Sequence, residues 1–394
     1  MKVKGFYAAA VQAGIRYRDR LDLGLIYSDR PAVAAGVFTT NTVKAAPVLL
    51  DIKRLRQGKA QAILVNSGNA NACNGEQGME LARSVSGMAA RQLDIDEELV
   101  QVASTGVIGE QLDPAPFAQQ MSALVDSLSE DGFDDLARAV MTTDTVPKVV
   151  CKTVDIGGTE VSILGVAKGS GMIMPNMATM LCFVVTDAQI VFPVLREIVA
   201  VGVEHTFNRI TVDGDTSTND TVLVLANGAA GNECLDEDSP EETEIFTRAM
   251  HSVFQELATM IVVDGEGATK AVTIRVIGAR EKEGALDAAR TIANSPLVKT
   301  AFFGEDPNWG RIMAALGRSG CFFHPDRVSI AFDEVVMAEQ GMGAGPEAEQ
   351  EAARVMRKDT FTLTVHLNDG MESAEVQTCD FSKEYITINA DYRS

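Results

Sequence analysis

The stretch Lys168-Gly-Ser-Gly-Met-Ile-Met-Pro-Asn-Met-Ala-Thr-Met-Leu181 joins a glycine-rich turn, a Pro-Asn break and an Ala-Thr step. Its two inner glycines allow backbone angles that other residues avoid, and Pro175 fixes its own φ. A strained loop therefore leads directly into the apolar run Leu181–Val185, which has the pattern of a buried strand. The hydroxyl of Thr179 stands at the joint, where an apolar strand does not need one.

A hydroxyl in this position can carry chemistry. An internal threonine can attack the carbonyl before it, break the chain and become an N-terminal threonine whose own amine acts as the base. The small Ala178 leaves that carbonyl unobstructed, and the reaction also needs donors for the oxyanion that forms. The same local pattern is typical of an ordinary turn that enters a strand, with threonine present for its β-propensity.

Length and composition indicate the broad class of protein. The chain has 394 residues, more than one hydrophobic core usually fills, so two domains are expected. No apolar run approaches the roughly 20 residues that span a bilayer. The first twenty residues hold only a very short apolar run, soon followed by arginines, which does not fit a signal peptide. We therefore expect a soluble cytoplasmic protein.

Charge and residue spacing exclude several functions. The formal net charge of −21 repels phosphate backbones, so nucleic-acid binding is not expected. None of the six cysteines forms a CxxC pair, and none of the four histidines has the HExxH spacing of zinc enzymes. No metal ion or other cofactor is therefore predicted.

Strand-length apolar runs alternate with helical patterns, which predicts an α/β or α+β fold rich in sheet. Strands are predicted at 21–27, 33–38, 60–65, 99–103, 149–154, 161–166, 181–185, 221–225, 271–277, 328–332, 360–367 and 375–379. Helices are predicted at 78–93, 114–128, 192–207, 241–260, 284–293 and 348–356. A long helical pattern ends in Asp264-Gly-Glu-Gly267 before a new strand pattern, which predicts a main domain over 1–270 and a smaller one over 271–394.

The segment Ser104-Thr-Gly-Val-Ile-Gly109 follows a predicted strand. A hydroxyl beside a glycine at a strand end can direct an O–H and a bare N–H at one spot, which an oxyanion hole requires. Thr105 and Gly106 are the candidates. The alternative is a plain turn between a strand and a helix.

Two further segments have the residue types of a binding site. Met141–Lys148 places several hydroxyls, Thr142 among them, around one acid, which suits an amino-acid zwitterion, although it also fits a helix that ends before Pro147. In Asp264–Lys270, Glu266 stands between glycines and is predicted to be an exposed carboxylate on a backbone that can approach a ligand.

Two polar clusters have mainly structural interpretations. Asp213–Asp220 begins like a calcium loop but lacks the glycine and the final glutamate, so a hydrogen-bonded acidic turn is predicted. Asn66–Gly75 holds four asparagines, which can satisfy tight turns or form part of an active-site wall.

Together these segments resemble one family, the arginine-biosynthetic ornithine acetyltransferases, which are also glutamate N-acetyltransferases. The resemblance covers the whole chain and keeps the family's order through 36–41, 66–75, 104–109, 141–148, 168–181, 211–220, 264–270, 304–311 and 389–394.

The resemblance implies a precursor that cleaves itself between Ala178 and Thr179 into chains 1–178 and 179–394, which stay together as one fold. That fold is a layered α/β sandwich of sheets flanked by helices, similar to the N-terminal-nucleophile hydrolases in mechanism more than in topology. A smaller C-terminal domain returns its tail to the active site. A dimer of cleaved pairs, that is, a heterotetramer, is implied as well.

The resemblance also implies the reaction, in which an acetyl group moves from N2-acetylornithine to glutamate through acetyl-Thr179 in arginine biosynthesis. It leaves open whether acetyl-CoA is a second donor. By residue matching, Thr179 is the nucleophile and Thr105 with Gly106 forms the oxyanion hole. The implied substrate contacts are Thr142, Lys168, Thr179, Glu266, Asn389 and Ser394.

Two rival functions remain open from the residues alone. A self-cleaving aminopeptidase or amidase would use the same nucleophile but would pass the acyl group to water. An acidic, glycine-rich carbohydrate- or metal-binding module would remain one intact chain and form no acyl intermediate.

Overall fold

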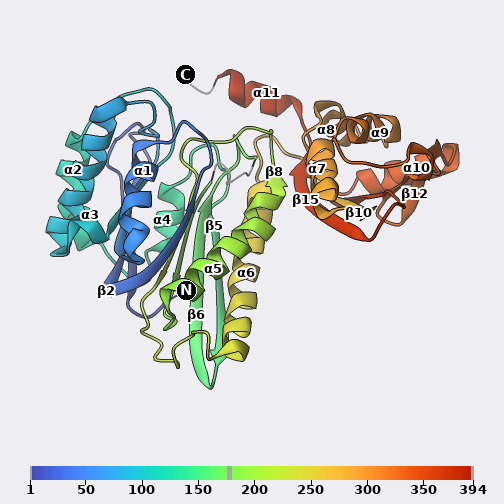
Figure 1. Cartoon of the computed structure of the whole chain (residues 1–394). Coiled ribbons are helices and arrows are strands. Elements are labelled where there is room, and N and C mark those ends of the chain that lie inside the picture. Colours follow the sequence, from blue (N-terminus) through green and yellow to red (C-terminus); the bar gives the residue numbers. More distant parts are fainter. Residues whose placement is uncertain (1, 175–179, 392–394) are drawn as a thin grey trace. The chain divides into compact units, whose positions relative to one another are not determined.

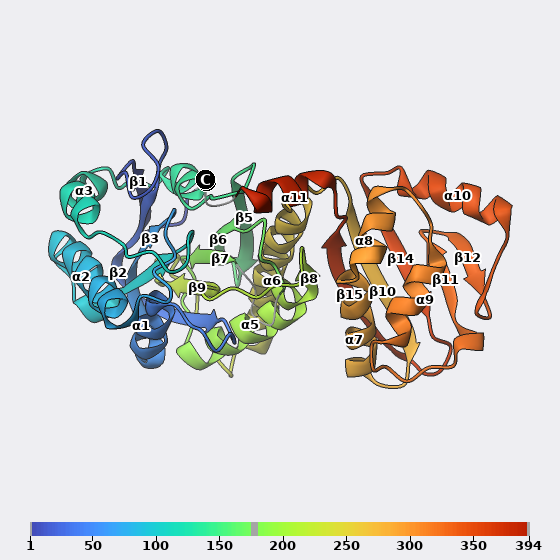
Figure 2. The same ribbon diagram turned by 90° about the horizontal axis from the view of Figure 1, so that it is seen from above.

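The computed structural model describes residues 2–174 and 180–391, which divide into two compact units (Figures 1 and 2). Unit 1 comprises Met1–Asn208 and Asp215–Ile261, and unit 2 comprises Arg209–Gly214 and Val262–Ser394. The predicted mixed α/β fold with sheets flanked by helices is confirmed, and each unit contains one of the two sheets.

The division differs in two respects from the predicted boundary after residue 270. It falls in the last turn of helix α6 (Pro240–Val263), so Glu266 belongs to unit 2. The short strand β8 (Ile210–Thr211) also joins unit 2, because it pairs in parallel with β15 (Glu372–Cys379). A two-residue strand that pairs with a partner so distant in sequence leaves no local pattern to predict.

Within the described residues, the sheet of unit 1 has eight strands. Seven follow the order β4-β3-β2-β9-β7-β6-β5, and β1 pairs with β2 outside this path. Their bounds are β1 Phe6–Val11, β2 Leu23–Phe38, β3 Lys59–Asn66, β4 Val100–Ser104, β5 Lys148–Ile156, β6 Thr159–Lys168, β7 Leu181–Thr186 and β9 Thr221–Ala226. The fully buried β7 and β9 lie side by side at the middle of this sheet.

Strand β2 is one long strand where the sequence predicts two. The residues Asp29, Arg30 and Pro31 have turn chemistry, and they are exposed. They do not end the strand. They lie where the pairing of β2 with β3 shifts register, between Tyr27 and Ala32. A bulge of this kind accommodates turn-like residues while the strand continues.

Helices cover the sheet of unit 1 (Figure 1). Helices α1, α2 and α3 bury residues such as Leu50, Leu81 and Phe117 in one core with β2, β3 and β4. Helix α4 contributes Leu136 to a second core with β6, β7 and β9. The helix bounds are α1 Ala46–Arg54, α2 Gly75–Leu93, α3 Ala115–Asp126, α4 Phe133–Ala139 and α5 Phe192–His205.

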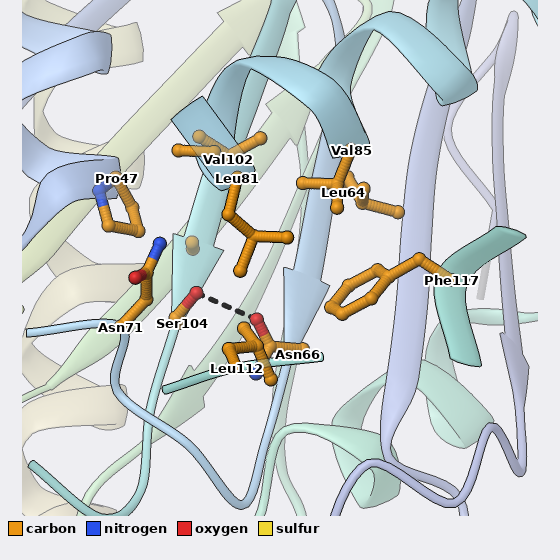
Figure 3. A pocket seen from close by; sticks show the side chains of 12 residues that line it. Pro47, Leu64, Asn66, Asn71, Leu81, Val85, Val102, Ser104, Leu112 and Phe117 are labelled. Atoms are coloured by element: carbon orange, nitrogen blue, oxygen red, sulfur yellow. Dashed lines mark hydrogen bonds between the residues drawn. The ribbon is translucent and has the colours of Figure 1, made fainter. Parts of the chain in front are cut away.

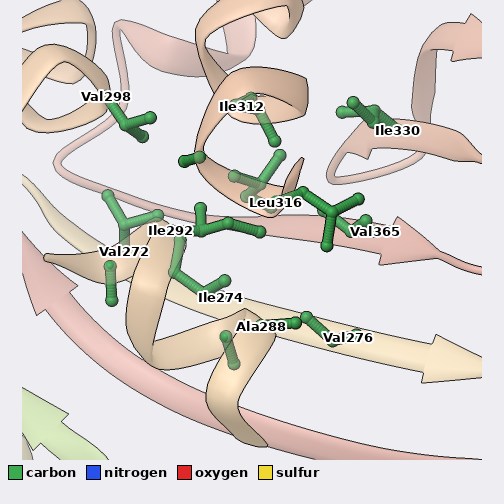
Figure 4. Close-up of a cluster of buried hydrophobic side chains, with 14 of the residues drawn as sticks. Val272, Ile274, Val276, Ala288, Ile292, Val298, Ile312, Leu316, Ile330 and Val365 are labelled. Atoms are coloured by element: carbon green, nitrogen blue, oxygen red, sulfur yellow. The ribbon is translucent and has the colours of Figure 1, made fainter. Parts of the chain in front are cut away.

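Unit 2 has a sheet of order β13-β12-β11-β14-β10-β15-β8. Figure 4 shows its core, where side chains of β10 meet those of α7 and α9. The bounds are β10 Ala271–Ala279, β11 Ser329–Phe332, β12 Val335–Glu339, β13 Met342–Gly343, β14 Thr360–His366, α7 Lys282–Ala293, α8 Pro296–Phe303, α9 Trp309–Gly317 and α10 Pro346–Met356.

The chain ends in helix α11 (Lys383–Ala390), which Ser382 caps by accepting a hydrogen bond from Glu384 N at 3.1 Å. The alternating apolar residues of this segment indicate an end that is tied into the fold. Helix α11 nevertheless buries none of its residues, and its Tyr385 ring stacks on that of Phe381. None of the described helices is long and apolar enough to cross a membrane.

Candidate functional site

A small pocket of unit 1 lies where β4 and β6 end and where β7 and β9 begin. Two residues that the sequence predicted for the site line this pocket together, namely Thr105 and Lys168. Lys168 is the last residue of β6, and it pairs with Leu181, the first residue of β7. The pocket is lined by Thr105, Lys168, Met180, Leu181, Ser217, Asn219 and Asp220.

Thr105 and Gly106 offer two donors next to each other. The Thr105 N–H is used, since it donates to Asn66 O at 3.0 Å. Within residues 2–174 and 180–391, neither the Thr105 hydroxyl nor the Gly106 N–H has a hydrogen-bond partner. These two groups are therefore available as hydrogen-bond donors, and their role in an oxyanion hole stays a prediction.

Only glycine fits at position 106. Its φ of +133° lies in a region that side chains avoid, and an added Cβ would lie 2.3 Å from Gly68 C. Gly106 and Gly68 are held close together by the next residue, Val107, because its N–H donates to Gly68 O at 3.3 Å. The asparagine-rich segment that follows β3 thus forms the wall against which the Thr105–Gly106 turn packs.

Lys168 is a buried cation at the pocket. Its side chain is 4% exposed, and among the described residues its ammonium group has no hydrogen bond or ion pair. It is close enough to two buried carboxylates, Asp144 and Asp220, to favour their charged forms. An ammonium group that is buried without a direct partner is suited to hold an anionic group of a ligand.

Thr142 is tied to the pocket indirectly. It is not among the residues that line the pocket, but its N–H donates to Asp144 Oδ2 at 3.1 Å. Asp144 Oδ1 accepts from Gly169 N at 2.7 Å and from Lys148 Nζ at 2.8 Å. The carboxylate therefore connects Thr142 to the residue that follows Lys168.

The charge of Asp144 is stabilised in place. Burial by itself would raise its pKa, but the charges of Lys168 and Lys148 and its hydrogen bonds outweigh burial, so its pKa is lowered. The Asp144–Lys148 pair is fully buried. The segment that carries Thr142 is therefore fixed by an ion pair as well as by hydrogen bonds.

Glu266 and Asn389 meet within unit 2, where Asn389 Nδ2 donates to Glu266 Oε2 at 2.8 Å. The expectation that Glu266 is exposed was wrong, since the residue is only 6% exposed. The reason is that the C-terminal segment covers its loop. Gly267 lies so close to Tyr385 N that an added Cβ would be 2.5 Å from it, and Ser382 Oγ donates to Gly267 O at 2.6 Å.

Three of the predicted site residues, Ala178, Thr179 and Ser394, lie outside the described residues. The structure also identifies pocket residues that the sequence did not predict for the site: Ser217, Asn219 and Asp220. The sequence does contain a signal that points to these residues. They directly precede a fully buried strand, and they lie at the end of the segment 211–220, which resembles the corresponding segment of the family.

A second pocket of unit 1 lies at the ends of β3 and β4 (Figure 3). It is mostly apolar, and at its polar end Ser104 Oγ donates to Asn66 Oδ1 at 2.7 Å. This bond joins the last residues of the two strands that lead to the Thr105–Gly106 turn and to its wall.

The match to a family model defines the class of this protein as an acetyltransferase. The family model described as "ArgJ family" matches residues 7–394, and the chain belongs to this family.

The whole chain aligns with known proteins of similar sequence. It is 56% identical to the arginine biosynthesis bifunctional protein ArgJ of Desulfotalea psychrophila and 51% identical to that of Geobacter sulfurreducens, over 100% of each chain in both cases. Among solved structures it is similar to ArgJ of Bacillus halodurans, at 40% identity and a TM-score of 0.50, covering 53% of this chain and 97% of that one.

Proposed function

We propose that this protein transfers the acetyl group of N2-acetylornithine to glutamate, giving ornithine and N-acetylglutamate for arginine biosynthesis. The observation that carries the proposal is the pair of available donors at Thr105 and Gly106, beside the buried Lys168, in a chain of the ArgJ family. An acetyl carbonyl that is attacked by a nucleophile develops negative charge on its oxygen, and such donors stabilise that charge.

Thr179 is the proposed nucleophile. Its α-amine, with an ordinary pKa of about 7.7–8.0, takes the hydroxyl proton while the oxygen attacks the acetyl carbonyl. The Thr105 hydroxyl and the Gly106 N–H donate to the oxyanion that forms. When the tetrahedral intermediate collapses, the C–N bond breaks and ornithine leaves with the proton. The glutamate amine then attacks acetyl-Thr179 by the same route in reverse.

The remaining predicted residues are proposed to bind the two amino acids. Lys168 and the hydroxyl of Thr142 suit a carboxylate, and Glu266 suits an ammonium group. Asn389 and Ser394 complete the set, and the hydrogen bond from Asn389 to Glu266 supports a shared role for these two.

Maturation is proposed to occur by cleavage between Ala178 and Thr179, which frees the amine of Thr179. The product is then a pair of chains, and two such pairs form the proposed heterotetramer in the cytoplasm.

Product analysis tests this function against a hydrolase. We expect the purified protein to form N-acetylglutamate and ornithine from N2-acetylornithine and glutamate in equal amounts. Without glutamate it should release little acetate after one turnover. Steady release of acetate that does not depend on glutamate would instead identify an N-terminal-threonine amidase, and the absence of either product would contradict both functions.

A further inference from the structure

The turn before β9 holds the residue that follows Thr179. Asp220 Oδ1 accepts a hydrogen bond from Met180 N at 3.0 Å, and the next residue, Thr221, donates its N–H to Met180 O at 3.0 Å. Both backbone groups of Met180 are therefore bound by this turn. Asp220 is 1% exposed, so the bond is shielded from water.

Asn219, the residue before Asp220, holds the turn that carries the proposed oxyanion donors. Asn219 Nδ2 donates to Ser104 O at 2.8 Å and to Ala70 O at 2.6 Å. Ser104 directly precedes Thr105, and Ala70 belongs to the wall against which Gly106 packs. Two consecutive side chains thus bind two parts of the chain that lie far apart in sequence.

The turn is held by hydrogen bonds of its own and by bonds from Thr39. Asn219 N donates to Ser217 Oγ at 3.0 Å, and Thr218 Oγ1 donates to Asn219 Oδ1 at 2.6 Å, which orients the amide group. Thr39, at the end of β2, donates its N–H to Asp220 O at 2.9 Å and its hydroxyl to Ser217 O at 2.7 Å. A hydrogen-bonded, buried turn of this kind keeps its two outward contacts at a fixed separation.

We propose that Asn219 and Asp220 are positioning residues that set the distance between the nucleophile and its oxyanion donors. The proposal rests on the proposed function, in which Thr179 attacks and Thr105 with Gly106 receives the oxyanion. Catalysis is sensitive to this distance, because a displacement of about 1 Å can cost about 100-fold in rate. The same separation governs self-cleavage, which uses the same hydroxyl.

Asp220 needs only to accept a hydrogen bond for this role. Burial, the main influence, raises the pKa of its carboxyl group well above the ordinary value, although the Met180 N–H and the charge of Lys168 act in the opposite direction. A neutral amide offers the same acceptor in the same shape. The substitution Asp220→Asn should therefore be tolerated, whereas Asn219→Asp removes the donor to Ser104 O and should not be.

The test measures the self-cleavage rate of the precursor by denaturing electrophoresis, and kcat and KM for N2-acetylornithine in the cleaved fraction. We expect Asp220→Ala, Asn219→Ala and Asn219→Asp to slow self-cleavage at least about 10-fold and to lower kcat about 10- to 100-fold. KM should stay within about threefold. Asp220→Asn should stay within about threefold of the unmodified protein in both rates.

Two buried residues at the other end of β7 are matched controls. Asp187 is 1% exposed, and its Oδ1 accepts a hydrogen bond from Ser162 N at 2.7 Å. Asn232 is 2% exposed, and its Oδ1 accepts a hydrogen bond from Gln189 N at 2.8 Å. Asp187→Ala and Asn232→Ala should lower the melting temperature but leave self-cleavage and kcat within about threefold. They separate a loss of position from a general loss of stability.

Three results would overturn the proposal. In the first, Asp220→Ala cleaves itself and transfers acetyl groups as fast as the unmodified protein. In the second, the control variants are impaired as strongly as the test variants. In the third, Asp220→Asn is as slow as Asp220→Ala. The last result would show that Asp220 acts through the proton or the negative charge of its carboxyl group, and not as an acceptor that anchors Met180. If the alanine variants do not fold, the contrast between Asp220→Asn and Asn219→Asp still decides. Acetylation of Thr179 in the unmodified protein tests the proposed function separately.

Discussion

Gly106 has a backbone conformation and a neighbour that exclude every side chain. The sequence predicts its role, because a hydroxyl next to a glycine after a strand can present two donors together. What the sequence does not contain is the contact with Gly68, since the loop after β3 and the loop after β4 meet only in the folded sheet. The same holds for Asn219 and Asp220, whose side chains act on carbonyl and N–H groups that carry no residue-specific pattern.

Replacement of Gly106 by alanine should therefore damage the site. A Cβ at φ +133° must move the Gly106 N–H away from its present direction. We expect kcat for acetyl transfer to fall about 100- to 1000-fold, the usual cost of one lost oxyanion donor. Steady-state kinetics with N2-acetylornithine and glutamate measure the change.

Gly231→Ala is the control for strain alone. Gly231 has a φ of +81°, but an added Cβ would have no neighbour within 4 Å. This variant should lose about 1 kcal/mol of stability and keep its activity. Equal losses of kcat in the two variants would show that Gly106 matters only for the fold.

At the scale of elements, most long helices and strands are predictable because their apolar periodicity is strong. The predicted elements at 181–185 and 221–225 correspond to β7 and β9. The missed strand β1 has three consecutive alanines, which favour helix over strand, and its extended form comes from pairing with β2. Burial of Glu266 was also not predictable, since it depends on a C-terminal segment more than a hundred residues away.

The buried pair of Asp144 and Lys148 provides a test at this scale. The folded-state pKa of Asp144 is lowered, so its charge contributes stability above the unfolded-state pKa of about 3.9, and this contribution is lost as pH falls through the folded-state value. Asp144→Asn removes the carboxylate of a fully buried ion pair with Lys148 and should cost about 3 kcal/mol at pH 7. In urea unfolding, the difference from the unmodified protein should shrink below about pH 4.

Asp51→Asn is a comparison variant, for which the stability difference from the unmodified protein should change with pH in the opposite direction. Burial raises the pKa of Asp51, despite its bond from Val102 N and the charge of Arg54, so ionisation destabilises the folded state as pH rises. The asparagine variant should gain stability relative to the unmodified protein between about pH 4 and pH 7. The same pH trend for both variants would contradict this account of the two carboxylates.

At the scale of the whole molecule, strand order explains how a cleaved chain can stay together. In unit 1, β9 and β7 lie between β2 on one side and β6 on the other. A cut between residues 178 and 179 would place β7 and β9 on the second fragment and their outer neighbours on the first. The fragments would then remain joined through the β2–β9 and β6–β7 pairings, along the full length of β7 and β9.

The division into two units shows where prediction from sequence ends at this scale. A change from a helical pattern to a strand pattern near residue 264 predicts a second domain, and the chain divides into units close to this position, after Ile261. The transfer of Arg209–Gly214 to unit 2 depends on the pairing of β8 with β15, for which local periodicity holds no signal.

We propose above all that Thr179 becomes an N-terminal nucleophile and carries the acetyl group. Mass spectrometry of the denatured protein, before and after brief exposure to N2-acetylornithine without glutamate, tests it most directly. We predict two fragments, the second beginning at Thr179, and a single added acetyl group on that residue after exposure, which glutamate then removes. Thr179→Ala should remain one chain and take up no acetyl group. An intact chain of 42.1 kDa that forms N-acetylglutamate, or an acetyl group on another residue, would contradict the account.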